Sequence, residues 1–349
     1  MLKAGALQIP TSGAPFERVT IDRRDPGPHD VLIRIHFVGI CHSDVHMALN
    51  QWGESIYPLV PGHEIAGVID AVGTEVTRFG TGDRVGVGCF VDSCRVCPNC
   101  RAGQQQFCVE GETETYNSVD KSGKRTQGGY SSHIVVDENY VLRIPDSLGL
   151  DTAAPLMCAG ISMYSPCRRW RVASGTKVAV VGLGGLGHVG VQVARALGAE
   201  VTLISHSSDK VADAARFGAA HFYVAKEPDD LRMLTNSFDV ILNTASSNVS
   251  TDLYLSLLDV DGVLVTVGLP VGPLSVSPMF LIQNQRVIAG TKNGGIAETQ
   301  GMLDFCAVHE IAAEVETLEA GQVDMAYRRL LAGDVRYRFV LDTSGLCLS

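Results

Sequence analysis

Lys177-Val-Ala-Val-Val-Gly182-Leu-Gly184-Gly185-Leu186-Gly187 is an apolar strand pattern that runs directly into a GxGxxG pattern and then into a segment with helical periodicity. In dinucleotide-binding βαβ units the first glycine allows a tight turn, the second lets a pyrophosphate approach the backbone, and the third lets the helix pack on the strand. The N–H groups of the helix N-terminus then face the phosphates. Glycines also cluster in ordinary turns, but the flanking strand and helix favour the dinucleotide site. We expect the cofactor to bind at Gly182, Gly184, Gly185, Leu186 and Gly187.

The sequence around this turn alternates between apolar strands and helical patterns from about residue 150 onward. Such alternation predicts parallel strands joined by crossover helices, that is, a doubly wound Rossmann sheet. We assign residues 159–292 to this dinucleotide-binding domain. The expected strands cover 177–181, 200–204, 221–224, 238–243 and 262–267, and the expected helices cover 185–197 and 209–217.

The residues after the second expected strand read Ser205-His-Ser207-Ser208-Asp209-Lys210. NAD-binding domains usually carry an acidic residue near this point for the ribose 2′-hydroxyl. Here the hydroxyls and the lysine suit a 2′-phosphate, and no carboxylate stands at the strand end to repel it. We therefore expect NADP(H), bound through Ser205, Ser207, Ser208 and Lys210. Two alternatives remain: a solvated turn in which Ser208 is a helix N-cap, and an Asp209 that reaches a ribose.

The rest of the chain is rich in predicted strands. Before residue 150 they are short and separated by turns, which predicts a compact β-rich, barrel-like domain. After residue 290 the chain has no dinucleotide-binding pattern, and we expect it to return to the first domain. The predicted fold is therefore α/β, with a β-rich barrel-type domain of residues 1–158 and 293–349 beside the Rossmann domain. The expected strands of this part are 31–38, 65–72, 83–88, 132–136, 141–144, 313–317 and 337–341, and its helices are 298–308 and 324–331.

The composition is that of a globular enzyme, with 46% hydrophobic and 19% charged residues in a chain of 349. The formal net charge of -10 disfavours a nucleic-acid partner, which would require a basic face. No apolar run has membrane-spanning length, and the first residues lack the pattern of a signal peptide. We expect a cytoplasmic protein that does not bind membranes, with cysteines as metal ligands or buried thiols rather than disulfides.

Four of the ten cysteines lie in one short segment, at Cys94, Cys97, Cys100 and Cys108. Four thiolates at this spacing can surround one tetrahedral zinc ion and fill all of its positions. Such a metal holds a loop together and does no chemistry. An iron–sulfur cluster is the chemical alternative, and the spacing to Cys108 favours zinc.

Three further metal-binding candidates are scattered: Cys41, in Gly39-Ile-Cys-His-Ser-Asp44; His63, in Pro61-Gly-His-Glu64; and Cys158. From the residues alone, each has an ordinary explanation as well. Cysteines are often small buried hydrophobic residues, and a histidine can simply be packed in the core. Composition does not choose between these explanations and an open metal site.

The chain as a whole resembles the zinc-dependent medium-chain alcohol dehydrogenases, specifically the cinnamyl alcohol dehydrogenase-like group. The matching segments run from end to end in the order of that family, and as a set they are highly specific. They are 39–44, Val60-Pro-Gly-His-Glu-Ile-Ala-Gly67, Gly82-Asp-Arg-Val85, Gln127-Gly-Gly-Tyr-Ser131, Ala153-Ala-Pro-Leu-Met-Cys-Ala-Gly-Ile161, the glycine pattern and Val335-Arg-Tyr-Arg-Phe339.

The resemblance implies a GroES-like catalytic domain with two zinc ions per subunit. Cys41, His63 and Cys158 would hold the catalytic zinc, with Glu64 close enough to replace its water transiently. Asp44 would orient His63 through the other ring nitrogen. The four clustered cysteines would hold the structural zinc.

The resemblance also implies roles for residues around the cofactor. Ser43 would pass a proton through the nicotinamide ribose to His46 and solvent, although a surface histidine on a short helix is the ordinary explanation for His46. His42 and Arg338 would approach the pyrophosphate, although Arg338 can also be a surface cation on an edge strand. Ser162 and the backbone of Val267, Gly268 and Leu269 would line the nicotinamide.

Trp52, Cys89 and Phe90 fall where the family lines its substrate pocket, although Trp52 and Phe90 can equally be core residues. Lys292, in Gly290-Thr-Lys-Asn-Gly294, departs from the family, which commonly has apolar residues there. This lysine either extends to solvent or makes the pocket tolerant of polar and acidic aldehydes.

Together these patterns predict NADP(H)-dependent interconversion of small-molecule primary alcohols and aldehydes, with aromatic or medium-size aldehydes reduced. An NAD-dependent polyol or secondary-alcohol dehydrogenase is the alternative within enzymes. A non-catalytic, zinc-stabilised nucleotide-binding protein is the alternative outside them. By resemblance we expect a homodimer, with the strand at 263–267 and the apolar region 276–282 as the pairing edge.

Overall fold

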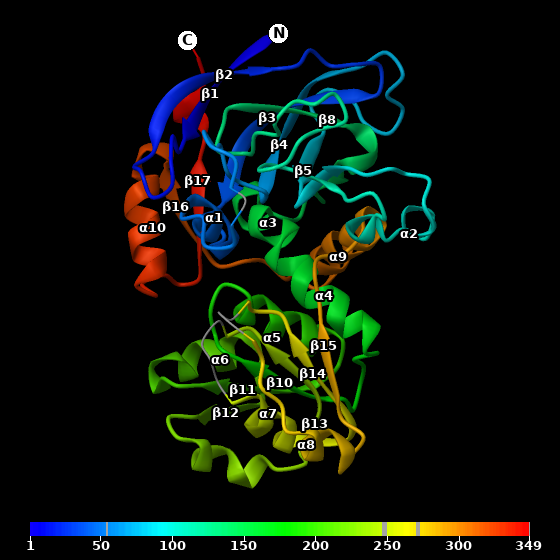
Figure 1. Cartoon of the computed structure of the whole chain (residues 1–349), viewed down its shortest axis with the longest axis vertical. Coiled ribbons are helices and arrows are strands. Elements are labelled where there is room, and N and C mark those ends of the chain that lie inside the picture. Colours follow the sequence, from blue (N-terminus) through cyan, green and yellow to red (C-terminus); the bar gives the residue numbers. More distant parts are fainter. Residues whose placement is uncertain (54, 246–249, 270–272, 349) are drawn as a thin grey trace. The chain divides into compact units, whose positions relative to one another are not determined.

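The computed structural model describes residues 1–53, 55–245, 250–269 and 273–348. The chain divides into two compact units (Figure 1). Unit 1 comprises Met1–Cys158 and Gly294–Ser349, and unit 2 comprises Ala159–Asn293. Within the described ranges no helix is long and apolar enough to cross a membrane.

Unit 2 is built on a six-stranded sheet in which every neighbouring pair is parallel. The strand order is β12-β11-β10-β13-β14-β15, so the order reverses between β10 and β13, where doubly wound sheets bind ligands at the carboxyl ends of the strands. This confirms the Rossmann prediction. The strands are β10 (Lys177–Val181), β11 (Glu200–Ser205), β12 (His221–Val224), β13 (Phe238–Asn243), β14 (Leu258–Thr266) and β15 (Val287–Gly290).

The glycines of the turn after β10 are required by its geometry. Gly182 has a φ of 89°, a conformation that favours glycine. A Cβ on Gly187 would lie 1.9 Å from the Gly182 carbonyl oxygen, so only glycine allows the start of helix α5 to pack this closely against the turn. The helices of unit 2 are α4 (Ala159–Arg169), α5 (Gly187–Ala196), α6 (Val211–Phe217), α7 (Thr251–Leu257) and α8 (Pro278–Ile282), with 3₁₀ turns at Ser208–Lys210 and Pro228–Leu234.

Unit 1 is organised around strand β3, which pairs with three other strands, β4, β8 and the C-terminal β17. The tail thus returns to the first domain, and in Figure 1 the red β17 lies beside the blue β3. The seven-stranded sheet has β16 (Val315–Glu319), β17 (Arg338–Asp342), β3 (Asp30–Gly39), β4 (Ile65–Val72), β5 (Arg84–Val87) and β9 (Leu142–Arg143) in that order, with β8 (His133–Asp137) on β3.

The remaining elements of unit 1 surround this sheet. A hairpin of β1 (Leu2–Gln8) and β2 (Glu17–Arg23) forms a separate two-stranded sheet that packs on the same core, and β6 (Phe90–Asp92) pairs with β7 (Thr113–Glu114) beside the cysteine segment. The helices are α1 (His42–Ala48), α2 (Pro98–Arg101), α3 (Leu150–Ala153), α9 (Ile296–Val308) and α10 (Val323–Leu331), and the 3₁₀ turns are Gln105–Phe107, Glu138–Tyr140, Ala154–Met157, Ala320–Gln322 and Ser344–Leu346.

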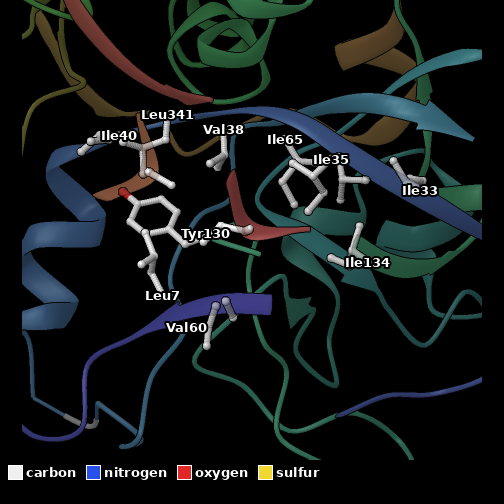
Figure 2. Close-up of a cluster of buried hydrophobic side chains, with 14 of the residues drawn as sticks. Leu7, Ile33, Ile35, Val38, Ile40, Val60, Ile65, Tyr130, Ile134 and Leu341 are labelled. Carbon is white, nitrogen blue, oxygen red and sulfur yellow. The ribbon is translucent and has the colours of Figure 1, made fainter. Parts of the chain in front are cut away.

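The core of unit 1 follows from the alternation along β3. Val31, Ile33 and Ile35 are at most 1% exposed, whereas Arg34, between two of them, faces outward. Figure 2 shows Ile33, Ile35 and Ile65 side by side in this core, with Tyr130 further along the same layer.

Two sequence expectations about the elements were wrong. The strand at 263–267 is not a sheet edge, because β15 pairs on its outer side. The apolar region 276–282, expected to take part in the same pairing, contains helix α8, which Pro278 opens, and its part in pairing stays a prediction. The strand expected at 313–317 begins two residues later, at Val315, where it pairs in parallel with β17.

We predict that two glycine-to-alanine substitutions in unit 1 have opposite effects. A Cβ on Gly67 would lie 2.1 Å from the Arg34 carbonyl oxygen, so Gly67→Ala must push β3 and β4 apart. The expected cost is about 2 kcal/mol. Gly301 lies in helix α9 and has open space where a Cβ would lie. Gly301→Ala should therefore stabilise the protein by about 0.5–1 kcal/mol. The midpoint of urea denaturation measures both, and a neutral Gly67→Ala would contradict the close approach.

Candidate metal and cofactor sites

The first metal-binding candidate is the cluster of Cys94, Cys97, Cys100 and Cys108, whose sulfur atoms all lie within 4.8 Å of one another. The Cys94 and Cys100 sulfurs are 3.8 Å apart. This separation matches the edge of a tetrahedron with Zn–S bonds of about 2.3 Å. Backbone N–H groups point at these sulfurs, and those of Val109 and Cys100 lower the pKa of Cys97 to about 6. The donor set therefore fits a zinc ion with no open position.

The segment that carries these cysteines is fastened to the sheet of unit 1. Arg95 forms ion pairs with Asp92 and Asp137, both at 2.9 Å. The Ser93 hydroxyl lies 2.7 Å from the Tyr140 hydroxyl and 3.2 Å from the Cys100 sulfur. A metal in this cluster would thus hold a surface loop against β8 and the turn that follows it.

The second candidate is formed by Cys41, His63, Glu64 and Cys158, whose ligand atoms also lie within 4.8 Å of one another. Three segments bring them together. β3 and β4 are antiparallel with Val38 opposite Ile65, so Cys41, just after β3, lies close to His63, just before β4. Cys158 follows the 3₁₀ turn Ala154–Met157. Two sulfurs and one imidazole nitrogen, with a carboxylate nearby, form the donor set of an open zinc site.

Electrostatics in this second cluster favour a thiolate on Cys41. A hydrogen bond from Cys158 lowers the pKa of Cys41 well below its ordinary value, against the opposing effect of burial. Hydrogen bonds with Cys41 and Cys89 raise the pKa of Cys158. Burial lowers the pKa of His63, but the Asp44 carboxylate and Cys89 outweigh it and raise this pKa well above its usual value. A cation that binds here must displace protons, so its affinity depends on pH.

Asp44 fixes the orientation of the His63 ring. Its carboxylate is fully buried, and one oxygen lies 3.1 Å from His63 Nδ1, so that Nε2 is left for a metal. The backbone N–H groups of Cys41 and Gly62 also donate to this carboxylate, at 2.9 and 3.2 Å.

Glu64 and Arg338 form a buried ion pair beside the cluster. Arg338 Nη2 contacts both carboxylate oxygens of Glu64, one of them at 2.5 Å, and the two residues are 0% and 4% exposed. Burial raises the pKa of Glu64 to about 8, although the guanidinium opposes this shift. Arg338 therefore is no surface cation on an edge strand: β17 pairs on both sides and directs this residue at Glu64.

Ser43 and His46 lie on helix α1, next to Cys41. The Ser43 hydroxyl lies 3.6 Å from the Cys41 sulfur. His46 Nδ1 lies 2.5 Å from Gln51 Oε1, and its ring stacks on Trp52 with centroids 4.8 Å apart. A hydrogen bond from Nδ1–H to Gln51 would leave Nε2 free to exchange a proton. Sequence reasoning missed Gln51, which has no motif signal of its own.

In unit 2 the structure brings Lys210 to the glycine turn, where its Nζ donates to the Leu183 carbonyl at 2.9 Å. Ser207 is the N-cap of the turn Ser208–Lys210, so the expectation that Ser208 is the cap was wrong by one residue. The side chain of Ser207 accepts from the Asp209 N–H and also contacts the Asp209 carboxylate.

The other expected cofactor residues of unit 2 lie in three places. The N–H groups of Val267 and Gly268, just after β14, both donate to the Asn243 carbonyl at 2.9 Å. Ser205 ends β11 and is buried, and Ser162 lies on α4. Leu269 is exposed.

The expected substrate-pocket residues fall into different environments. Cys89 lies within hydrogen-bonding reach of Cys158, next to the second cluster. Phe90 is 4% exposed and packs edge-on against Tyr140, as a core residue does. Trp52 is 41% exposed and Lys292 is exposed as well. Sequence reasoning assigned no role to Tyr116, whose ring lies 5.7 Å from that of His63.

Comparison with known proteins places this geometry in a family. The model of the alcohol dehydrogenase GroES-like domain matches residues 27–146, and that of the zinc-binding dehydrogenases matches residues 185–308. The chain is 57% identical to NADP-dependent alcohol dehydrogenase C of Mycobacterium tuberculosis, over 99% of this chain and 100% of the relative. It is 46% identical to the aldehyde reductase YahK of Escherichia coli, over 99% of each chain.

Solved structures agree with the sequence matches. A cinnamyl alcohol dehydrogenase of Sorghum bicolor superposes with a TM-score of 0.96 at 40% identity, covering 100% of this chain and 99% of that one. A cinnamyl alcohol dehydrogenase of Helicobacter pylori, complexed with NADP(H), gives a TM-score of 0.92 at 41% identity over 98% of each chain. The chain therefore belongs to the zinc-dependent medium-chain alcohol dehydrogenases and, among them, to the cinnamyl alcohol dehydrogenase-like group.

Proposed function

We propose that this protein is a zinc-dependent oxidoreductase that interconverts primary alcohols and aldehydes with NADP(H). The observation that carries the proposal is the second cluster, in which Cys41, His63 and Cys158 form an open donor set with the Ser43 hydroxyl beside it. The relatives named NADP-dependent alcohol dehydrogenase and aldehyde reductase support the same reaction class. A non-catalytic nucleotide-binding protein would have no need for this second set of ligands or for the adjacent hydroxyl.

Cys41, His63 and Cys158 would hold the catalytic zinc. When bound, zinc supplies a Lewis acid for the carbonyl oxygen and NADPH supplies the hydride for the carbonyl carbon. The Glu64 carboxylate belongs to the same cluster and is paired with Arg338, so the three other ligands would leave one coordination position for substrate oxygen. Cys94, Cys97, Cys100 and Cys108 would hold a second, structural zinc.

Ser43 would hold the proton that the product alkoxide receives. His46, whose Nδ1 is anchored on Gln51, would exchange this proton with solvent through Nε2 when the cofactor is bound. The stacking of Trp52 keeps the imidazole ring in place, so Trp52 would act through His46 as well as line the pocket.

NADP(H) is favoured over NAD by the polar groups at the end of β11. Lys210 and the hydroxyls of Ser205 and Ser207 would bind the 2′-phosphate, while Asp209 is engaged by Ser207. An NAD-dependent polyol or secondary-alcohol dehydrogenase is the alternative, and it would require Asp209 to turn toward a ribose.

A cytoplasmic homodimer is part of this proposal. Among the strands of unit 2 that the structure describes, β15 is the end strand of the sheet, and its outer side has no strand partner there. Met279 and Ile282 on α8, and Val287 on β15, are exposed apolar residues in the same part of the sequence. A second copy that pairs with β15 would cover a strand edge and apolar surface together.

We predict different outcomes for two cysteine substitutions. Cys41→Ser should lower kcat by about 100-fold or more in a protein that still folds, because it removes a ligand of the open site. Cys97→Ser should instead lower the thermal unfolding temperature, because it removes one ligand of the structural zinc that holds the segment 94–108 together. Zinc content, circular dichroism melting and NADPH oxidation measure these effects, with Cys347→Ser, an exposed thiol, as the control. Full activity in Cys41→Ser would refute the proposed catalytic site.

We predict that aldehyde reduction is faster with NADPH than with NADH, and that Lys210 contributes to the preference. Steady-state kinetics over a panel of aldehydes should show kcat/KM for NADPH falling about tenfold in Lys210→Ala, while kcat/KM for NADH changes little. Lys177→Ala is the control, because Lys177 lies at the opposite end of β10 from the glycine turn. Equal losses for both cofactors would argue against a 2′-phosphate contact.

We predict that Lys292 biases substrate choice toward acidic aldehydes. Lys292→Leu should raise the ratio of kcat/KM for cinnamaldehyde over 4-carboxybenzaldehyde about threefold, which is the scale of one exposed charge interaction. Lys124→Leu, an exposed lysine of unit 1, controls for the general loss of a positive charge. An unchanged ratio would mean that Lys292 has no part in substrate choice.

A further inference from the structure

We propose that Tyr130 is a positioning residue for the metal site: its hydroxyl holds the Asp44 carboxylate, and through Asp44 it holds the His63 ring. This inference rests on the proposed function, in which His63 is a ligand of the catalytic zinc. It assigns a role to the Gln127-Gly-Gly-Tyr-Ser131 segment, which neither the donor set nor the proton relay explains.

Four hydrogen-bonding groups contact the carboxylate of Asp44. One oxygen accepts from the Gly62 N–H at 3.2 Å and lies 3.1 Å from His63 Nδ1. The other accepts from the Cys41 N–H at 2.9 Å and from the Tyr130 hydroxyl at 3.3 Å. Asp44 and Tyr130 are both 0% exposed. Water therefore cannot replace a donor that is lost.

The backbone explains why the Tyr130 hydroxyl reaches this carboxylate. Gly128, Gly129 and Tyr130 donate N–H bonds to Val60, Gly62 and Pro61, at 2.7, 2.8 and 2.9 Å respectively. The segment that carries Tyr130 is therefore fixed along the segment that carries His63.

The glycines make this pairing tight. A Cβ on Gly128 would lie 2.3 Å from the Pro61 carbonyl oxygen, and a Cβ on Gly62 would lie 2.6 Å from a ring carbon of Tyr130. The Tyr130 ring is thus held against the backbone next to His63, and it cannot shift without separating the two segments.

The carboxylate sets the direction of this hydrogen bond, because it can only accept, and the single proton of Tyr130 goes to Asp44. The Tyr327 hydroxyl, on α10, donates to the other side of the Tyr130 hydroxyl at 3.4 Å. Phe16 packs on both rings, with centroids 5.9 Å from Tyr130 and 5.1 Å from Tyr327. In Figure 2 the Tyr130 oxygen points from the core toward the blue helix, α1, which carries Asp44.

Tyr116 packs on the ligand that Asp44 orients. Its ring lies 5.7 Å from that of His63, measured between centroids. Tyr130 holds the carboxylate by its hydroxyl, and Asp44 in turn orients His63. Groups that hydrogen-bond to an orienting carboxylate commonly affect metal affinity about 10-fold or more.

The experiment uses the full-length, zinc-loaded enzyme and measures two quantities: the rate of zinc transfer to the chelator 4-(2-pyridylazo)resorcinol, and kcat for an aldehyde with NADPH. Tyr130→Phe should release the zinc of the open site about tenfold faster and lower kcat, while the KM for NADPH stays the same. Tyr327→Phe is the matched control in the same aromatic cluster. It leaves the Tyr130 hydroxyl on Asp44, so it should release zinc at the rate of the parent protein.

A double-mutant cycle tests whether Tyr130 acts through Asp44. If it does, Asp44→Asn with Tyr130→Phe should lose zinc no faster than Asp44→Asn alone. Additive effects, parent-like zinc release in Tyr130→Phe, or equal losses in Tyr130→Phe and Tyr327→Phe would each overturn the proposal. If Tyr130→Phe does not fold, Phe16→Leu, which loosens the packing of the Tyr130 ring, takes its place and should release zinc faster than the parent protein. Parent protein that retains a single zinc ion would instead contradict the proposed function.

Discussion

A single buried carboxylate is the constraint on which the second cluster depends. An ionised group without solvent is unfavourable unless its oxygens are satisfied, and Asp44 satisfies them with groups from three segments of unit 1. Those segments are the start of α1, the residues before β4, and the residues before β8. Because the Asp44 carboxylate needs donors from all of these segments, it fixes the positions of Cys41 and His63 relative to each other.

The two cysteine-containing clusters differ in what surrounds their ligands. The closed cluster, Cys94 to Cys108, forms within one short segment. Its sulfurs accept hydrogen bonds from backbone N–H groups, and surface ion pairs such as that of Arg95 with Asp137 fix the segment to the sheet. The open cluster draws its ligands from the ends of β3 and β4 and from the turn before Cys158, deep in unit 1. Local chain geometry suffices for the first, whereas the second exists only when the sheet has formed.

The sequence predicted the local features of this protein better than those that depend on tertiary contacts. The pattern from Lys177 to Gly187 is local, because strand, turn and helix are adjacent in sequence, and it predicted the parallel sheet correctly. The ligands at Cys41, His63 and Cys158 have no shared local pattern and were predicted only by resemblance. β15 was missed because Val287–Gly290 is too short to stand out, and the wrong sheet edge followed from that omission. The contacts between side chains were the hardest feature to predict from the sequence. Nothing near Arg338 in the sequence indicates that it pairs with Glu64, because the tertiary pairing of the strands decides that contact.

The pairing of β17 with β3 has a consequence for how the protein is made. Arg338 and Glu64 are separated by 274 positions, and β17 is the last strand of the chain as the structure describes it. While the ribosome is still adding unit 2, Glu64 has no cation and β3 lacks one neighbour. Removing one partner of a buried ion pair costs about 3–5 kcal/mol, so a first half that folded without β17 would carry that penalty. The second cluster therefore reaches the form described here only after β17 has paired with β3.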